Sequence, residues 1–373
     1  MDTGQEHFEI VSDPQTLRSL QGEWEALSRR SKRSRFSQSF VWCWTSWETV
    51  ERPRARKLHC VVLRRGERLV LLWPFTIRRK KFLTLAEPLG CAYSEYPDPL
   101  VEDGDEGFGR VKAAWQFLRS TCRCDLIILR HVPEGSLLHS VLQSGNAQPH
   151  STLTNLRVSF DNHENWQSYY RSTPANDRRD NERRRRRLEE RARVAFEVVE
   201  GSQGQPMIEW ALKQKAQQLS QDDRARRWLQ SKSYRDLLVA VSSRGGPEGR
   251  LAIFVLKIDD AVAATIIGRV DQHRVEAMTT TYDATYREFA PGKLLLAECL
   301  KWAAHNKLEF DLRGGDFPYK RRWANRESMI HDYKHGNSAF YAISVRLPFA
   351  VPILRWCRRL AGQRRTTKSE ETT

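Results

Sequence analysis

The sequence predicts an α/β protein with mixed sheets, organised in two domains. The chain has 373 residues, more than the ~250 to 300 at which a single hydrophobic core usually stops growing. In both halves, runs with the 3.6-residue period of a helix alternate with β-branched runs that are typical of strands. Hydrophobic residues make up 40% of the chain, as in folded globular proteins. Two cores of ordinary size are therefore expected.

The first domain is predicted over residues 1–160. We expect helices at residues 15–29, 41–47 and 108–119, and strands at 58–63, 69–77, 82–89 and 125–130. Ser37 or Ser39 is the expected N-cap of the second helix. The sequence RRGER separates the first two strands, and Gly66 at its centre predicts a hairpin turn.

A charged segment over residues 161–200 is predicted to form a helix and then a strand at 194–199. Nine arginines and four acids fall between Arg178 and Arg193, and the acids stand at helix-neighbour spacings that relieve the repulsion. Two interpretations stay open: a solvated surface helix that bridges the domains, or a contact with phosphates or nucleic acid. No alternation of basic and aromatic residues supports base stacking here.

The second domain is predicted over residues 201–346. Helices are expected at residues 207–219, 234–241 and 293–305, and strands at 250–258, 261–270, 273–282 and 308–312. Only two residues separate each neighbouring pair among the first three strands, Asp259-Asp260 and Asp271-Gln272. Such short turns predict an antiparallel meander.

The composition indicates anionic partners and a reducing compartment. The formal net charge is +16, which favours anionic ligands without naming one. The seven cysteines include no Cys-x-x-Cys pair, so we expect free thiols and no zinc site. No secretory signal or membrane-spanning apolar run is evident, which predicts a cytoplasmic protein without a transmembrane helix. The ten histidines form no His-x-x-x-His pair on a predicted helix, and Gly-x-Ser-x-Gly is absent, so neither a metal enzyme nor a serine hydrolase is favoured.

An anion site is predicted where the last meander strand leads into a helix. The residues at this junction are Ala290, Pro291, Gly292 and Lys293. The start of a helix presents unpaired N–H groups and the positive end of the dipole, and a glycine lets a phosphate approach the backbone. A pyrophosphate or a carboxylate could bind at such a helix start, although a Pro-Gly pair is also common in ordinary turns.

The run FDLRGGDFPYKRRW, residues 310–323, is a second candidate site. It holds two acids, an adjacent pair of glycines and a Tyr-Lys pair within fourteen residues. A segment that only fills a core does not need this set of groups. Gly314 and Gly315 predict a sharp turn that leaves room for a substrate.

These motifs resemble the Gcn5-related N-acetyltransferase (GNAT) superfamily, and within it the two-domain CelD-like branch (cellulose-biosynthesis or BioF-like), which is related to Fem-type transferases. PGKLL matches the branch's Pro-Gly-x-Leu-Leu element, and DLRGGDFPYKRRW matches its Asp-x-x-x-Gly-Asp-x-x-Tyr-Lys-x-x-Trp element. FSQSFVWCWTSW, LWPFTI and LGCAYSEYPDPLV resemble segments of its first domain. The resemblance covers residues 8–346 and implies tandem GNAT-like domains with a cleft between them.

The resemblance also implies a reaction and roles for residues. Acetyl-CoA or another acyl-CoA is the implied donor, with its pyrophosphate on residues 290–293. Asp311 is expected to accept a proton from the acceptor or to orient the acceptor's hydroxyl or ammonium group. Lys320 is expected to stabilise the developing negative charge, and Tyr319 to protonate the leaving thiolate. For each residue a structural alternative stays open: Asp311 as a cap of backbone amides, Tyr319 as a core aromatic, and Lys320 as a surface charge.

The implied acceptor is an amino sugar of a polysaccharide precursor, free or lipid-linked. In the first domain, Tyr93, Glu95, Tyr96 and Asp98 form an acidic-aromatic loop that suits a sugar ring, and Gly315 and Asp316 are expected to contact the same substrate. One alternative is a Fem-type peptidyl transferase that uses aminoacyl-transfer RNA. The long helical arm of some Fem-type members is not evident, because residues 207–241 predict only two short helices. Another alternative is a non-catalytic module that binds an anion.

The C-terminal segment, residues 347–373, predicts a short helix with one apolar and one basic face, followed by a polar tail. Such a helix suits an anionic inner-membrane surface. The alternative is a helix that packs on the second domain. Peripheral attachment at the inner face of the membrane is thus the second expectation for location.

Overall fold

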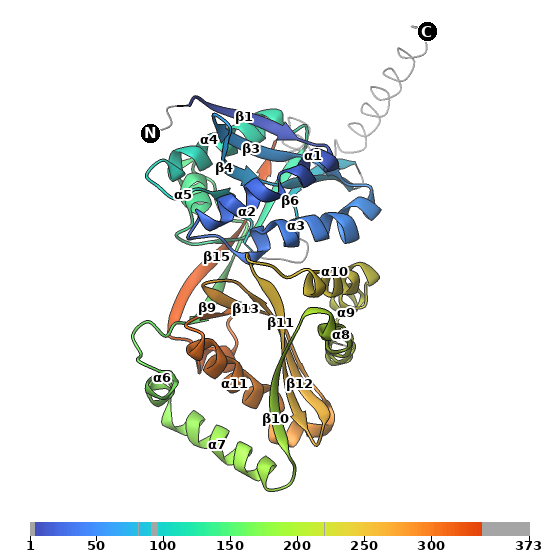
Figure 1. The fold of residues 1–373 in the computed structure, drawn as a ribbon, viewed down its shortest axis with the longest axis vertical. Coiled ribbons are helices and arrows are strands. Elements are labelled where there is room, and N and C mark those ends of the chain that lie inside the picture. Colours follow the sequence, from blue (N-terminus) through green and yellow to red (C-terminus); the bar gives the residue numbers. More distant parts are fainter. Residues whose placement is uncertain (1–3, 81, 91–95, 220, 338–373) are drawn as a thin grey trace, which may run out of the picture.

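The computed structural model describes residues 4–80, 82–90, 96–219 and 221–337, which form two lobes joined by strands (Figure 1). In this part of the chain an 11-stranded mixed sheet runs through both lobes in the order β10-β11-β12-β13-β14-β9-β15-β8-β6-β5-β2. A 4-stranded sheet, β1-β3-β4-β7, lies in the first lobe. The predicted α/β class with mixed sheets is confirmed.

The first lobe is the upper one in Figure 1 and contains helices α1–α5. Its elements are β1 (Glu6–Val11), α1 (Pro14–Ser19), α2 (Gln21–Arg29), α3 (Phe40–Ser46), β2 (Lys57–Leu58), β3 (Cys60–Arg65), β4 (Arg68–Trp73), β5 (Phe75–Lys80), β6 (Leu83–Pro88), β7 (Leu100–Val101), α4 (Gly107–Thr121), β8 (Leu126–Pro133) and α5 (Leu137–Ser144). Of the two N-caps proposed for the second helix, Ser39 is correct, because its side chain accepts from the backbone N–H of Trp42.

One predicted strand of this lobe is wrong in extent. Residues 69–77 form two strands that belong to different sheets, β4 in the 4-stranded sheet and β5 in the 11-stranded one. The break falls at Pro74, which has no N–H to donate to a ladder. The apolar run continues through the proline, so hydrophobicity alone does not mark the break.

The second lobe is the lower one in Figure 1. Its elements are β9 (Ser151–Val158), α6 (Trp166–Ser172), α7 (Ala175–Glu189), β10 (Val194–Glu200), α8 (Gln205–Gln218), α9 (Asp223–Leu229), α10 (Lys232–Ser243), β11 (Arg250–Ile258), β12 (Ala261–Val270), β13 (Arg274–Tyr282), α11 (Pro291–His305), β14 (Glu309–Gly314), α12 (Pro318–Arg321) and β15 (Arg326–Gly336). The predicted meander is confirmed as β11-β12-β13. At its first turn both Asp259 and Asp260 have positive φ, as a tight hairpin requires.

Among the elements of the second lobe, β9, α6, α9, α12 and β15 were not predicted. Residues 205–243 form three helices, α8, α9 and α10, where the sequence predicted two. Strand β15 follows the strand that was expected to be the last. It pairs with β9 along one edge and with β8 along the other, so it ties the two lobes together. The sequence of β15, RESMIHDYKHG, is rich in charged residues and lacks a clear apolar alternation, which hid it.

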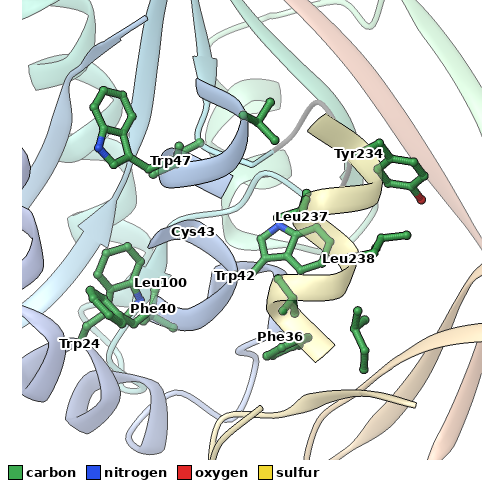
Figure 2. Packing of buried hydrophobic residues seen from close by; sticks show 14 of the residues in the cluster. Trp24, Phe36, Phe40, Trp42, Cys43, Trp47, Leu100, Tyr234, Leu237 and Leu238 are labelled. Carbon is green, nitrogen blue, oxygen red and sulfur yellow. The ribbon is translucent and has the colours of Figure 1, made fainter. Parts of the chain in front are cut away.

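A hydrophobic cluster joins the lobes on the side of α10. Figure 2 shows Trp42 and Phe36 of the first lobe beside Leu237 and Leu238 of α10. Each of these four side chains is at most 1% exposed. Full burial of a side chain of this size stabilises the fold by roughly 1.5 to 3 kcal/mol. The shared cluster therefore fixes how the lobes sit against each other.

The arginine-rich helix is confirmed as α7, and the strand after it as β10, an edge of the large sheet. Helix α7 packs against α11 and is held there by ion pairs, among them Arg185–Glu298. The predicted C-terminal helix, residues 347–373, lies outside the described residues. Within the described part of the chain, every helix is too short or too polar to cross a bilayer.

Candidate functional site

The candidate site forms where two neighbouring strands part. Parallel strands β13 and β14 pair over only three residues each, and the last pair is Glu276 with Asp311. Beyond it β14 bulges away and rejoins β9 at Gly314, opposite Asn155. The two strands therefore form a fork that opens at Ala277 on one side and at Leu312 on the other.

A bulge in β13 widens this fork. The register with β12 shifts so that Ala277 faces Gly268 and Thr279 faces Ile267, which leaves Met278 without a partner on β12. Bulged residues have no ladder partner and bend the strand. The Met278 carbonyl accepts a hydrogen bond from Arg313 Nη1 at 3.4 Å. The arginine of one strand thus spans the gap to the other.

A cavity of about 680 Å³ occupies the fork. Its walls come from β13, β14, the start of α11, the α12 segment and the α8–α9 pair. Much of the lining is apolar, including Leu219, Trp228, Met278 and Leu312. Helix α8 packs against the meander, α9 packs against α8, and both helices contribute to one side of the cavity. A cavity of this size and lining is typical of a small-molecule or cofactor site.

Among the residues that the structure describes, all of the charged side chains that line this cavity are basic. They are Lys215, Arg287, Lys293, Arg313, Lys320 and Arg322. Burial lowers the pKa of Lys215 on α8. Six cations surround one apolar cavity whose wall, in the described part of the chain, holds no Asp or Glu. This makes a positive site that favours anionic ligands.

The predicted anion site at the start of α11 forms part of this wall. Ala290 adopts the left-handed conformation (φ 50°) and stands just before the helix, with Pro291 at its first position. A Cβ added at Gly292 would find only Tyr282 Cδ1, at 3.7 Å. The space above this glycine is therefore open to the cavity. The Lys293 ammonium lies 3.7 Å from Asp180 of α7, so α7 lies beside the cavity.

The Tyr-Lys pair also lines the cavity, and its two side chains differ in environment. Lys320 is only 5% exposed, and its Nζ donates to the carbonyl oxygens of Arg313 (2.9 Å) and Gly314 (2.8 Å). Its positive charge is thus anchored at the end of β14. Tyr319 is 40% exposed and stacks on Phe317. Burial raises the pKa of the Tyr319 phenol, so it keeps its proton at neutral pH.

Asp311 does not line this cavity. It is fully buried, and its Oδ2 accepts a 2.7 Å hydrogen bond from the Tyr96 hydroxyl of the first lobe. Its Oδ1 accepts from the backbone N–H of Arg313 at 2.8 Å. The bond to Arg313 is the backbone cap that was the alternative to a general base. The general-base role of Asp311 stays a prediction.

A second cavity, of about 650 Å³, lies between the lobes and contains Asp98. Arg35 and Gln38 of the first lobe line it together with Asn155 and Arg157 of β9. Unlike the cavity in the fork, it carries both acids and bases. The Asp98 Oδ1 atom is buried without a hydrogen-bond partner among the described atoms.

Asp98 is expected to make stability depend on pH. Burial raises its pKa to about 6, against the lowering effect of Ser136 and Arg35. An unfolded Asp titrates near 3.9, so its buried charge costs stability above pH ~6 and nothing below pH ~4. Asp98→Asn should raise the free energy of unfolding by about 1 to 3 kcal/mol at pH 8 and leave it nearly unchanged at pH 4. Urea unfolding at both pH values tests this, and an equal effect at both would contradict it.

The other predicted substrate residues are scattered. Gly315 has a positive φ (106°) and its N–H donates to the Thr154 carbonyl, while Asp316 pairs with Arg321 on the surface. Tyr93 and Glu95 lie outside the described residues. Sequence reasoning missed the cavity residues of α8 and α9 and the bases at 287, 313 and 322. Arg313 and Arg322 lie inside the motif at residues 310–323 and could have been predicted from it. No local sequence pattern singles out Lys215 or Trp228.

Comparisons with known proteins support the overall fold. Residues 175–321 match the family model of the acetyltransferase (GNAT) domain. No curated protein matches the chain. The solved structure of FemX is 10% identical, with a TM-score of 0.63 over 90% of this chain and 99% of that one. L-PGS from Bacillus licheniformis is 10% identical, with a TM-score of 0.50 over 92% and 96%. A tandem GNAT protein from the clavulanic acid biosynthesis pathway is 13% identical, with a TM-score of 0.49 over 90% and 99%. The likeness to FemX and L-PGS is one of fold.

Proposed function

Because residues 175–321 match the acetyltransferase (GNAT) domain model and the chain shares its fold with FemX, we propose that it is a GNAT-type transferase that moves an acyl group from acyl-CoA to an amine. The observation that carries this proposal is the cavity in the β13–β14 fork, with its six basic side chains and its helix start. Acyl-CoA combines an anionic nucleotide with an apolar arm. The cavity offers complementary surfaces for both parts.

Charge and strand geometry support the following position for the donor. The pyrophosphate lies at the start of α11, where Gly292 leaves space and Lys293 and Arg287 supply charge. The pantetheine arm, which contains amides, enters the fork, where β13 lacks its β14 partner beyond Glu276. Unpaired strand backbone binds such an extended arm by main-chain hydrogen bonds. The acyl group then reaches the level of the Met278 bulge.

For the transfer itself, the protein must keep the attacking amine neutral, stabilise the oxyanion and supply a proton to the leaving thiolate. A neutral amine attacks the thioester carbonyl carbon, forming the C–N bond and an oxyanion, and the C–S bond then breaks. The anchored Lys320 ammonium and the bulged backbone at Met278 stabilise the oxyanion. Tyr319 gives its proton to the departing thiolate, and the proton lost by the amine returns to the phenol through water. Positive charge around the cavity lowers the pKa of a bound amine and so favours its neutral, nucleophilic form.

The acceptor that we propose is an amino sugar of a polysaccharide precursor, free or lipid-linked. The support is the motif resemblance in both halves of the chain and the mixed acidic and basic lining of the second cavity. Such a lining suits hydroxyl-rich ligands, which both donate and accept hydrogen bonds.

Aminoacyl-transfer RNA is the second candidate donor, and one observation favours it. Helix α7 exposes Arg179, Arg183, Arg186 and Arg187, which fall on one face at helical spacing. Among the described residues, Arg179, Arg186 and Arg187 have no ion-pair partner. This basic stripe begins beside Asp177 and Asp180, which pair with Arg322 and Lys293 of the cavity wall. A polyanion longer than CoA would extend along it.

Thermal unfolding with each ligand separates these donors. A ligand that binds only the folded state at 100 times its dissociation constant adds about 2.7 kcal/mol of stability. We expect acetyl-CoA to raise the melting temperature, and bulk transfer RNA at equal phosphate concentration to raise it less. The variant Arg179→Gln/Arg186→Gln/Arg187→Gln should leave the acetyl-CoA shift unchanged. A shift with transfer RNA alone, lost in this variant, would favour the second candidate.

A further inference from the structure

The fork is held from outside its own lobe. Glu276 and Asp311, the last paired residues of β13 and β14, both face Arg35 of the first lobe. Arg35 Nη1 lies 2.6 Å from Glu276 Oε1 and 3.5 Å from Asp311 Oδ2. One guanidinium thus contacts both strands at the point where they separate.

The surroundings fix the orientation of this guanidinium. Its Cζ lies 3.8 Å from the ring centroid of Tyr96, and the hydroxyl of the same tyrosine donates to Asp311. Stacking on an aromatic face and contact with two carboxylates use the planar shape of arginine, which lysine lacks. Arg35 also lines the second cavity. It therefore contacts both the second cavity and the paired strand ends from which the fork opens.

The buried charges at the fork are balanced. Arg269 of β12 lies 2.5 Å from Glu276 Oε2 and over the Trp42 ring, and both ion-pair partners are at most 1% exposed. Nearby, Arg274 faces Asp271. Burial raises the pKa of Glu276, but Arg269, Arg35 and Arg274 outweigh it and lower that pKa to about 2. Removal of Arg35 alone would leave an uncompensated negative charge in this buried place.

We propose that Arg35 is a positioning residue for the donor site, through which the first lobe sets the opening of the β13–β14 fork. It neutralises the two carboxylates that end the paired stretch and so keeps these strands together up to that point. Without it the carboxylates of Glu276 and Asp311 repel each other, the paired stretch opens, and the walls at Ala277 and Leu312 lose their spacing. This inference rests on the proposed binding of acyl-CoA in the fork.

The test is a double-mutant cycle read by calorimetric titration with acetyl-CoA at a temperature where every variant is folded. Arg35→Met should weaken acetyl-CoA binding at least 10-fold. Arg35→Met/Asp311→Asn removes one charge of each sign and leaves the Arg269–Glu276 pair balanced, so it should recover most of the affinity. Non-additivity of this kind is the signature of direct coupling.

Arg110→Met is the matched control. Arg110 is 4% exposed in the same lobe and pairs with Glu6 and Glu106, away from the fork. It should lower the melting temperature and leave acetyl-CoA affinity within about two-fold, since its partners do not line the donor cavity. If Arg35→Met does not fold, Arg35→Lys replaces it in the comparison. This variant keeps the charge, loses the stacking on Tyr96, and should weaken binding about 3- to 10-fold.

The outcomes separate this inference from the proposed function. A wild-type protein that binds no acetyl-CoA overturns the proposed function, and the inference with it. A wild-type protein that binds, together with an Arg35 variant that behaves like Arg110→Met, overturns the inference alone. Weak binding that the double variant does not recover also overturns it, because charge balance would then not be the cause.

Discussion

Gly292→Val is expected to weaken acyl-CoA binding at least 100-fold and to leave the fold intact. The added Cβ meets only the edge of Tyr282 at an ordinary contact distance, so the protein itself accommodates the side chain. The two methyl groups then occupy the space in which a phosphate approaches the start of α11. Calorimetric titration with acetyl-CoA measures the affinity, and circular dichroism checks the fold.

Gly22→Val provides the control for this experiment. Gly22 is the second residue of α2, as Gly292 is of α11, and a Cβ there meets nothing within 4 Å. Both variants replace glycine with valine in a first helical turn, so both carry the same small change in helix propensity. If the Gly292 variant binds acetyl-CoA as the Gly22 variant does, the pyrophosphate does not bind at α11.

Tyr319→Phe is expected to reduce turnover by about 10²-fold or more, the usual effect of losing a general acid. Acetyl-CoA affinity and melting temperature should change little, because the ring and its stacking on Phe317 remain. The measurement is the release of CoA thiol from acetyl-CoA with glucosamine as acceptor. Turnover falling with KM unchanged would place the effect in the chemical step.

Tyr282→Phe is the comparison for this prediction. Tyr282 lines the same cavity at the far end of β13, and the mechanism gives its hydroxyl no task. Its turnover should therefore stay within a few-fold of the wild type. Equal losses in both variants would mean that the cavity responds to the loss of any hydroxyl, and the assignment of Tyr319 as general acid would fail.

The second half of the chain was more predictable than the first. Its meander follows from β-branched runs joined by two-residue turns, and each signal lies within about ten residues. The sequence signals for helix starts are also local: Ser39 caps α3, and Pro291 is the first residue of α11. In the first half, one apolar run passes through Pro74 and predicts a single strand, whereas the structure has β4 and β5 there. Strand β15 was missed because its pairing with β8 and β9 stabilises it, and its own pattern does not.

The residues of the candidate site also fall into a group that the sequence predicts and a group that it does not. Six of the predicted residues, Ala290, Pro291, Gly292, Lys293, Tyr319 and Lys320, line one cavity, because they come from two short motifs at the ends of adjacent elements. The α8–α9 wall with Lys215 and Trp228 was not predicted. These residues meet the fork only because the helices dock on the meander, and any amphipathic helix would show the same spacing.

The sequence by itself determined the α/β class, the helix and turn chemistry around the two motifs, and the surplus of positive charge. Each of these depends on neighbours a few residues apart or on composition. Only the tertiary structure decided that Asp311 lies behind the cavity and not in it, and that Arg35 reaches Glu276 across 241 positions of the chain. Local side-chain patterns carry no information about such a partner, because its distance depends on the path of the whole chain between the two residues.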